Sequence, residues 1–318
     1  EIGVRLVGSE MCIRDSYYKG HLNKHNVILT QGVDAVCIFV NDTADADVLR
    51  MMADNGVKLL ALRCAGYNNV DLKAAAECGI TVVRVPAYSP YAVAEYTVAL
   101  MLSLNRKIPR ATWRTRDGNF SLHGLLGFDM YGKTVGIIGT GKIAKKLIMI
   151  LRGFGMNILA YDLYPDYNFA REHQVVYTTL DELYHSSDII SLHCPLTEQT
   201  KYLINDYSIS KMKDGVMIIN TGRGQLIHTN ALIEGLKNKK IGSAGLDVYE
   251  EESEYFYEDQ SDHIIDDDVL ARLLSFNNVI VTSHQAFFTR EALENIASTT
   301  LQNIREFTSG KALENKVI

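Results

Sequence analysis

Residues 134–155 read TVGIIGTGKIAKKLIMILRGFG, and this stretch decides the fold. Its first part, Thr134–Gly139, is a solid apolar run of the kind that forms a buried parallel strand. The letters GTGKIA at 139–144 fit the pattern G-x-G-x-x-A, and the letters after them have helical spacing. A glycine pattern alone is weak evidence, because glycines also occur in ordinary turns. Between a strand and a helix, it predicts the nucleotide-binding unit of a parallel sheet.

Each position of this pattern has a physical role in holding a dinucleotide. Gly139 permits the tight turn, Gly141 lets the backbone approach a pyrophosphate, and Ala144 allows close packing of helix on sheet. The first residues of the helix, Lys142 and Ile143, offer free N–H groups and the partial positive charge of the helix N-terminus to the phosphates. The alternative is a glycine turn in an α/β fold that binds no cofactor.

Asp162 predicts which dinucleotide binds. It ends the next expected strand, Asn157–Asp162, and lies 162 − 144 = 18 residues past the last position of the pattern. A carboxylate there can accept hydrogen bonds from both hydroxyls of the adenosine ribose, and it would repel a 2′-phosphate. No arginine follows in residues 163–165. The sequence therefore predicts NAD rather than NADP.

Strands and helices alternate on both sides of this stretch, which predicts an α/β protein with two doubly wound parallel sheets. The first sheet is expected to contain the strands Ala35–Val40, Leu59–Cys64 and Thr81–Val85, with helices at Asp45–Gly56 and Asp71–Gly79. The second sheet is expected to add the strands Val175–Tyr177, Asp188–His193, Val216–Asn220, Ser243–Val248 and Val279–Ser283. Further helices are expected from Pro90 to about Arg106, from Ile108 to about Asp117, and over about Arg290–Ser309.

Two domains are expected, because 318 residues are too many for one ordinary core. The first comprises residues 1–98 and is completed by 291–318, since the last helix follows the second sheet and can return to the first. Residues 99–290 form the NAD-binding domain. The acidic and aromatic stretch Glu250–Asp268 is too long for a simple connection, and it predicts a functional loop.

The composition argues against several classes of function. Hydrophobic residues make up 47% and charged residues 22%, and no apolar stretch approaches the roughly 18 residues of a membrane helix. A net charge of −6 without a block of Lys or Arg argues against nucleic acid or an anionic membrane as a partner. The five cysteines form neither a CxxC pair nor a cluster with zinc spacing. We therefore expect no metal site, and reduced thiols in the cytoplasm.

Residues 1–16 read EIGVRLVGSEMCIRDS and are expected to be non-native. The string resembles a translated sequencing adapter, and it lacks the pattern of a signal peptide. The alternative is a genuine, divergent N-terminus. No function is inferred from this segment.

Polar residues at strand ends are the candidates for catalysis, because ligands of doubly wound sheets bind there. Of nine histidines, His193 and His284 end expected strands, and the residues alone do not choose between them. Arg223 stands in the glycine-flanked sequence NTGRG, and the acidic run Glu250–Glu252 follows another strand. Each has a plainer interpretation: a hydrogen-bonded structural histidine, a surface arginine in a turn, or a solvated acidic loop.

Seven segments together resemble the D-2-hydroxyacid dehydrogenase family, and within it the fermentative bacterial branch that interconverts pyruvate and D-lactate. They are RCAGYNNVDL (63–72), VPAYSPYAVAEY (85–96), GKTVGIIGTGKIA (132–144), DIISLHCPLT (188–197), IINTGRG (218–224), GLDVYEEE (245–252) and VIVTSHQAFFT (279–289). The likeness runs from about His21 to the C-terminus. These motifs are numerous and correctly ordered, so the resemblance is specific.

The resemblance implies a catalytic set and two sets of binding residues. Arg223 matches the arginine of N-T-x-R-G, His284 the histidine of H-Q-A-F, and Glu252 the glutamate five residues after the aspartate of G-L-D-V. The implied cofactor contacts are Gly139, Gly141, Lys142, Ile143, Asp162, Cys194, Pro195, Thr200, Thr221, Gly222 and Asp247, the last near the nicotinamide amide. The implied substrate contacts are Ala65, Gly66 and Tyr88.

The resemblance also implies an architecture and a reaction. It implies a flavodoxin-like substrate domain and a Rossmann NAD domain, with an active-site cleft between them, and a homodimer formed through the helices after Pro90. The implied reaction is the reversible reduction of pyruvate to D-lactate, with the hydride supplied by NADH. His284, with Glu252 beside it to favour the charged imidazolium, would donate the proton. Arg223 would bind the carboxylate and polarise the carbonyl group.

Two positions depart from the family pattern: His228 replaces a usual aspartate, and Tyr96 replaces a frequent histidine. The first β-α unit, which normally precedes Leu22, is not recognised. Within the family, the alternatives are dehydrogenases of 2-hydroxyisocaproate, glycerate or phosphoglycerate, and the last commonly carries an extra regulatory domain. From another class, the alternative is an NAD-binding corepressor-like scaffold, whose disordered tails this sequence does not show.

Overall fold

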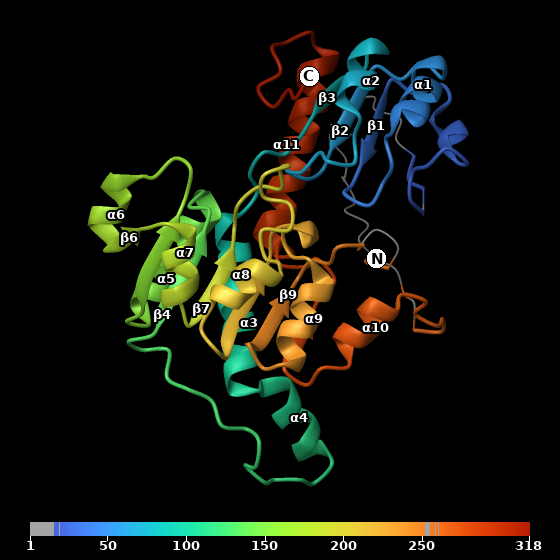
Figure 1. Cartoon of the computed structure of the whole chain (residues 1–318). Helices are drawn as coiled ribbons and strands as arrows, with labels where there is room; N and C mark the ends of the chain where they lie inside the picture. The colour runs from blue at the N-terminus through green and yellow to red at the C-terminus, as the bar shows by residue number, and fades with distance from the viewer. Residues whose placement is uncertain (1–15, 19, 252–254, 258, 260) are drawn as a thin grey trace. The chain divides into compact units, whose positions relative to one another are not determined.

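Two separate parallel sheets organise the chain, so the expected α/β class is confirmed (Figure 1). The computed structural model describes residues 16–18, 20–251, 255–257, 259 and 261–318. The sheets lie in two units: unit 1 comprises Glu1–Ser89 and Phe288–Ile318, and unit 2 comprises Pro90–Phe287. Residues 1–15 of the segment expected to be non-native lie outside the described residues.

Unit 1 is built on a sheet whose described strands have the order β1-β2-β3, all parallel. Its elements are η1 (Val27–Thr30), β1 (Ala35–Ile38), α1 (Ala46–Asp54), β2 (Leu59–Leu62), α2 (Leu72–Glu77), β3 (Thr81–Val83) and α11 (Arg290–Thr308). Helix α11 packs against β2, and Ile304 and Phe307 cover the core residues Leu59 and Val83. The end of the chain therefore completes this unit.

Unit 2 contains a seven-stranded parallel sheet in the order β10-β9-β8-β7-β4-β5-β6. Its strands are β4 (Thr134–Ile138), β5 (Asn157–Tyr161), β6 (Val175–Tyr177), β7 (Ile189–Leu192), β8 (Val216–Asn220), β9 (Ile241–Leu246) and β10 (Val279–Val281). Its helices are α3 (Pro90–Arg106), α4 (Ile108–Arg116), α5 (Lys142–Gly153), α6 (Tyr167–His173), α7 (Leu180–Ser186), α8 (Asp206–Lys211), η2 (Gly224–Leu226), α9 (Thr229–Lys237) and α10 (Asp268–Leu274). Strands β7 and β8 are buried throughout, because helices cover both faces.

Local sequence signals explain where the helices start. Asp45 and Asp71 are N-caps: their carboxylates accept hydrogen bonds from the backbone N–H of Val48 and Ala74, so α1 and α2 begin one residue later than expected. Thr289 caps α11 in the same way. The long apolar helix α3 begins at its proline, Pro90, as expected. In the part of the chain that the structure describes, no helix is long and apolar enough to cross a membrane.

The division between the units differs from the expected boundaries at 98/99 and 290/291. The structure divides the chain after Ser89 and after Phe287. A boundary at 98/99 would cut α3, which is one continuous helix and packs as a whole on α5, β8 and β9 of unit 2. Most expected strands also ran one or two residues too far, because the expected ranges included the residues directly after the strand ends, among them Gly139, Asp162 and His193. Those extra residues carry the candidate site.

Candidate active site

The candidate site lies at one edge of the sheet in unit 2. Strand β4 has β5 on one side and β7 on the other, so the order of the strands reverses at β4. In such sheets, ligands bind beyond the carboxyl ends of the strands at the point of reversal. The residues that follow those ends are Gly139 after β4, Asp162 after β5, His193 after β7, Thr221 and Arg223 after β8, Asp247 after β9 and His284 after β10.

The glycine loop after β4 fits a pyrophosphate. Gly139 has a φ of +89°, and a Cβ there would overlap the backbone of Cys194. Gly141 is the N-cap of α5 and makes no side-chain cap, and a Cβ on it would meet nothing within 4 Å. The first N–H groups of α5, those of Lys142 and Ile143 among them, are therefore left for an anion. Ala144 is fully buried, as close packing of the helix requires.

Asp162 is held in place by hydrogen bonds from Thr140 of the glycine loop and from Tyr164. One carboxylate oxygen accepts hydrogen bonds from the backbone N–H of Thr140 at 2.5 Å and from the Thr140 hydroxyl at 2.9 Å, and the other from the N–H of Tyr164 at 2.9 Å. Burial alone would raise the pKa of Asp162, but these hydrogen bonds outweigh it and hold the pKa below its ordinary value. An ionised carboxylate is thus fixed where a ribose would bind.

Thr140 and Tyr177 are residues at this site that sequence reasoning missed. The Tyr177 hydroxyl lies 2.8 Å from the Thr140 hydroxyl and accepts a hydrogen bond from the N–H of Asp166 at 3.1 Å. It therefore connects the glycine loop to the segment after Asp162. Thr140 stands at a variable position of the glycine pattern, and Tyr177 ends β6, so no pattern in the sequence marks either one.

The segment after β7 lies against the glycine loop, because Gly139 and Cys194 approach each other closely. Burial raises the pKa of the Cys194 thiol to about 11, so it stays protonated at neutral pH. Thr200 folds the rest of this segment: its hydroxyl donates to the carbonyl oxygen of Pro195 at 2.7 Å and accepts from the N–H of Thr197 at 2.8 Å. The expected cofactor contacts Cys194, Pro195 and Thr200 therefore belong to one ordered turn.

Arg223 is placed by a turn that Asn220 organises. The Asn220 side chain accepts from the N–H of Gly222 at 3.0 Å and donates to the carbonyl oxygen of Arg223 at 2.9 Å. A Cβ on Gly224 would overlap the carbonyl oxygen of Tyr249, so only glycine fits there. The guanidinium contacts the carbonyl oxygen of Gly222 at 2.8 Å, and no ion pair among the described residues involves it. Its remaining donors suit a carboxylate.

Thr221 makes a structural contact besides its expected contact with the cofactor. Its hydroxyl lies 3.0 Å from that of Thr97 on α3, and both side chains are buried. The Thr97 hydroxyl also donates to the carbonyl oxygen of Val93 at 2.7 Å. Thr221 therefore ties the start of the arginine turn to the long helix α3, and its contact with a cofactor stays a prediction.

Asp247 holds the turn that carries His284. Its fully buried carboxylate accepts hydrogen bonds from the Thr282 hydroxyl at 2.7 Å, the N–H of Gln285 at 2.9 Å and the N–H of Ala286 at 2.8 Å. Burial raises the pKa of Asp247 above its ordinary value, although these hydrogen bonds oppose the shift. The expected contact between Asp247 and the nicotinamide amide stays a prediction, and the structure adds this anchoring role.

The two candidate histidines have different surroundings. His284 donates its backbone N–H to the carbonyl oxygen of Asp247 at 2.7 Å, and its φ is +52°, a left-handed conformation that only about a few per cent of residues other than glycine adopt. The ring of His193 instead contacts the hydroxyl of Ser191 at 2.8 Å, and burial lowers its pKa to about 4. His193 is therefore neutral at physiological pH and is poorly suited to donate a proton.

The two departures from the family pattern have local explanations. The Tyr96 hydroxyl accepts a hydrogen bond from the Gln285 side chain at 2.8 Å, next to His284. His228 precedes α9 and stacks edge-on against Tyr202, with ring centroids 5.1 Å apart. Tyr96 thus supports the turn of His284 from α3, whereas His228 packs beside the start of α9.

The expected substrate residues in unit 1 follow two neighbouring strands. Ala65 and Gly66 come after β2, and the Arg84 guanidinium donates to the carbonyl oxygen of Ala65 at 2.9 Å. Tyr88 comes after β3, and the Asn295 side chain on α11 donates to its carbonyl oxygen at 2.7 Å. Hydrogen bonds from elsewhere in unit 1 therefore fix both segments.

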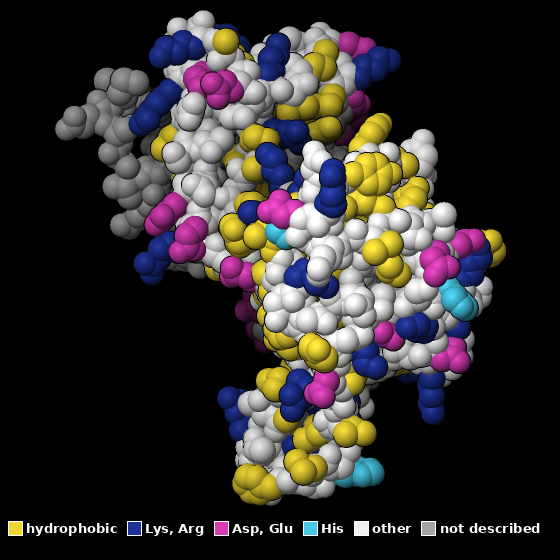
Figure 2. Space-filling view, turned by 90° about the vertical axis from the view of Figure 1, so that its left-hand side faces the viewer, with side chains coloured by type: hydrophobic (Ala, Val, Ile, Leu, Met, Phe, Trp, Pro, Cys, Tyr) yellow, Lys and Arg dark blue, Asp and Glu magenta, His cyan; other side chains and the backbone are white. Residues whose placement is uncertain are grey.

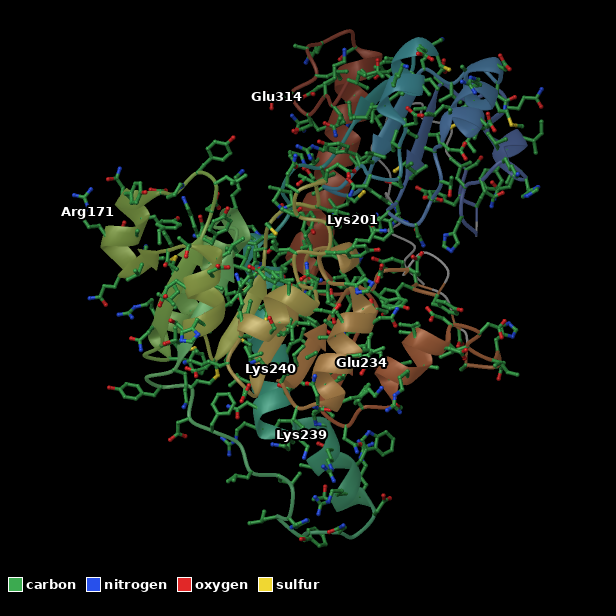
Figure 3. All side chains as sticks on the ribbon, viewed as in Figure 1. Arg171, Lys201, Glu234, Lys239, Lys240 and Glu314 are labelled. Atoms are coloured by element: carbon green, nitrogen blue, oxygen red, sulfur yellow. The ribbon has the colours of Figure 1, made fainter. Side chains whose placement is uncertain are left out.

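Two further features of unit 2 lie apart from these residues. Glu252, the expected partner of His284, lies outside the described residues. A surface hollow lies at the opposite edge of the sheet from the glycine loop, beside the amino ends of β8 and β9, where Figure 3 labels three of its lining residues, Glu234, Lys239 and Lys240. Its charges are mixed, since Lys240 pairs with Asp214 at 2.8 Å, so we do not assign the reaction to it.

Comparisons with known proteins agree with this arrangement. The family profile described as "D-isomer specific 2-hydroxyacid dehydrogenase, NAD binding domain" matches residues 98–286. The chain is 55% identical to the D-lactate dehydrogenase of Escherichia coli over 287 residues, which cover 90% of this chain and 87% of that protein. It is 54% identical to a 2-hydroxyacid dehydrogenase homolog of Haemophilus influenzae over 315 residues, which cover 99% and 95% of the two chains.

A solved structure is similar over nearly the whole chain. It is that of a D-lactate dehydrogenase from Aquifex aeolicus complexed with NAD and lactic acid. The TM-score is 0.83 at 35% sequence identity, and the match covers 92% of this chain and 88% of that one.

Proposed function

Because this chain belongs to the D-isomer specific 2-hydroxyacid dehydrogenase family, we propose that it reduces pyruvate reversibly to D-lactate with NADH. One observation carries the proposal: the glycine loop, Asp162, Arg223 and the turn of His284 all follow the carboxyl ends of strands in one sheet. Together they supply a dinucleotide site, a carboxylate ligand and a proton donor, which are the parts that reduction of a 2-keto acid requires.

In the proposed mechanism, each residue acts on one part of the substrate. The glycine loop and Asp162 would hold NADH, which when bound would supply the hydride for the carbonyl carbon. Arg223 binds the carboxylate of the 2-keto acid with its paired N–H groups and stabilises the negative charge that develops on the carbonyl oxygen. His284 donates a proton to that oxygen. Glu252 favours the imidazolium form of His284, as the family resemblance implies.

We assign the remaining substrate contacts to unit 1. The backbone N–H groups at Ala65 and Gly66 would hold the carboxylate, and Tyr88 would contact the bound acid. Hydrogen bonds from Arg84 and Asn295 fix both segments, as described above. A fixed loop and a phenol ring leave room for a methyl group more readily than for a branched chain. This favours pyruvate over larger 2-keto acids.

A panel of 2-keto acids tests the proposal. We expect kcat/KM to be highest for pyruvate, lower for 2-ketobutyrate by roughly tenfold or more, and lowest for 2-ketoisocaproate and phenylpyruvate, since one methylene is worth about 1–3 kcal/mol. The product should be D-lactate by chiral chromatography. A preference for 2-ketoisocaproate would move the enzyme to the branched hydroxyacid group, and L-lactate would refute the proposal. NADH binding without turnover of any acid would favour a scaffold.

The choice of NAD over NADP should depend on Asp162. Leu163 beside it is 73% exposed, so an arginine fits there without repacking. We expect Asp162→Ala with Leu163→Arg to shift the ratio of kcat/KM values toward NADP by roughly 10- to 100-fold, because a hydrogen bond to a charged group is worth about 1.5–3 kcal/mol. Leu163→Arg alone is the control. An unchanged ratio in the double variant would contradict the role of Asp162.

We propose that the chain forms a homodimer through the helices after Pro90, with residues 107–127 as an arm. The side chain of Asn105 closes the base of this arm: it donates to the carbonyl oxygen of Phe128 and accepts from its N–H, both at 2.8 Å. Trp113 is 66% and Leu126 88% exposed, and Figure 2 shows apolar side chains spread over the arm, the lower lobe of that view. An apolar surface of this kind suits contact with a second copy.

We expect Trp113→Glu combined with Leu126→Glu to convert the dimer to a monomer, because a charge buried without a partner opposes association. Sedimentation velocity would measure the change. Tyr207→Glu, which alters an exposed aromatic residue on α8, is the control and should stay dimeric. A double variant that remains dimeric would exclude the arm as the interface.

We also propose a cytoplasmic location, since no disulfide joins the cysteines of the described residues.

A further inference from the structure

The segment between β9 and α10 is fastened to unit 2 at both ends. At its start, the Glu250 carboxylate accepts from the N–H of Thr229 at 3.3 Å and from its hydroxyl at 2.8 Å, and the Tyr202 hydroxyl also donates to it. Across its base, the Tyr249 hydroxyl donates to the Asp267 carboxylate at 2.6 Å. Both ends of the segment are therefore held by hydrogen bonds of their side chains.

The described middle of the segment is anchored as well. Phe256 is 7% exposed and belongs to the hydrophobic core on the α7–α10 face of the sheet. Its neighbours Tyr255 and Tyr257 are half-buried and pack against the same core. Buried aromatic rings fix this part of the backbone, so the side chains beside Phe256 have defined positions.

Tyr257 reaches the turn of His284. Its hydroxyl donates to the backbone carbonyl oxygen of His284 at 3.2 Å, and the two ring centroids lie 6.0 Å apart with 33° between the ring planes. Tyr257 has a φ of +72° and His284 a φ of +52°. Two residues in left-handed conformations thus meet through a hydrogen bond and a ring contact. Such conformations persist in residues other than glycine when the surroundings determine them.

The peptide groups of His284 are therefore held from two sides. Its N–H donates to the carbonyl oxygen of Asp247 at the end of β9, and its carbonyl oxygen accepts from Tyr257. The sheet supplies the first contact, and the segment after β9 supplies the second. Without the second, the carbonyl group would lose a partner, and the direction of the imidazole would be less strongly determined.

We propose that Tyr257 is a positioning residue, which fixes the backbone of His284 so that its imidazole points at the substrate oxygen. This inference rests on the proposed function of His284 as the proton donor. Tyr257 itself touches no reacting atom in this mechanism. The long acidic and aromatic segment would then have a second role besides supplying Glu252, because its Tyr257 would orient the imidazole of His284, the proposed proton donor.

Tyr257→Phe is the test, since it removes one hydroxyl and keeps the ring that packs on the core. We expect kcat for pyruvate reduction to fall by roughly tenfold, within the 10²-fold that misplacing a catalytic group can cost. KM for pyruvate and the Kd for NADH, measured by fluorescence titration, should not change. The solvent deuterium isotope effect on kcat should rise, because proton transfer becomes more rate-limiting. Tyr255→Phe, in the same segment, is the matched control and should behave as the parent enzyme.

The outcomes separate this inference from the proposed function. His284→Gln is assayed in parallel, and if it kept full activity, the role of His284 itself would be wrong. If His284→Gln is inactive but Tyr257→Phe matches Tyr255→Phe in kcat and isotope effect, the positioning role alone is overturned. A joint loss of kcat, pyruvate affinity and NADH affinity in Tyr257→Phe would also overturn it, because that pattern indicates a general disturbance of the fold.

Discussion

Replacing His284 with glutamine is expected to lower kcat for pyruvate reduction by roughly 10²–10⁴, the usual contribution of a general acid, while NADH still binds. The imidazole is lost, and glutamine cannot donate a proton to an alkoxide as readily. The turn itself should survive, because Asp247 holds it through the backbone N–H groups of Gln285 and Ala286, which the substitution leaves in place. Steady-state kinetics and fluorescence titration of NADH measure the two effects separately.

His193→Gln is the matched control for this prediction. His193 also follows the end of a strand at the same edge, but its pKa of about 4 leaves it neutral at physiological pH. We expect a much smaller loss of kcat than for His284→Gln. A larger loss for His193→Gln would mean that the two histidines have been assigned the wrong way round.

Replacing Arg223 with glutamine is expected to damage both binding and rate. The guanidinium would contact the carboxylate in the ground state, so KM for pyruvate should rise by about 10- to 100-fold, as for the loss of a hydrogen bond between charged groups. It would also stabilise the developing oxyanion, so kcat should fall by roughly 10²–10³. Together the two effects lower kcat/KM. Even the smallest combined fall expected for Arg223→Gln exceeds the smallest fall expected for His284→Gln.

Arg223→Lys separates charge from shape. Lysine keeps the positive charge but lacks the planar pair of donors, so we expect partial recovery of KM and little recovery of kcat. The turn should persist in both variants, because Asn220 holds it through backbone atoms. If Arg223→Gln changed kcat alone and left KM intact, the arginine would not be the carboxylate ligand.

Much of the fold could be predicted because the hydrophobic pattern is strong. The central strands are apolar throughout, and Asp45 and Asp71 mark the starts of helices with side chains that cap them. Strand ends were less predictable. Val248 and Thr282 are apolar or β-branched, as in a strand, although β9 has already ended at Leu246 and β10 at Val281.

The sequence suggests the candidate site as a set of residues, but it does not predict the contacts between them. The choice of Arg223 and of His284 rather than His193 comes from the resemblance to the family, because the residues alone leave both histidines open. The hydrogen bonds that orient the site residues join residues far apart in the chain, such as Tyr257 with His284 and Thr97 with Thr221. No local pattern encodes such pairs, because tertiary packing brings them together. The left-handed backbone conformation of His284 could not be predicted either, since nothing in the letters SHQAF requires it.

Gly224 has a consequence for how this enzyme can evolve. Its missing side chain allows the turn after β8 to lie against the carbonyl oxygen of Tyr249, where the next catalytic segment begins. Any missense change at this codon would force the two backbones apart, which would displace Arg223 on one side and Tyr249 on the other. A position with no functional group should therefore tolerate mutation as poorly as the reacting residues do. We therefore expect the turn after β8 and the segment that begins at Tyr249 to change together during evolution.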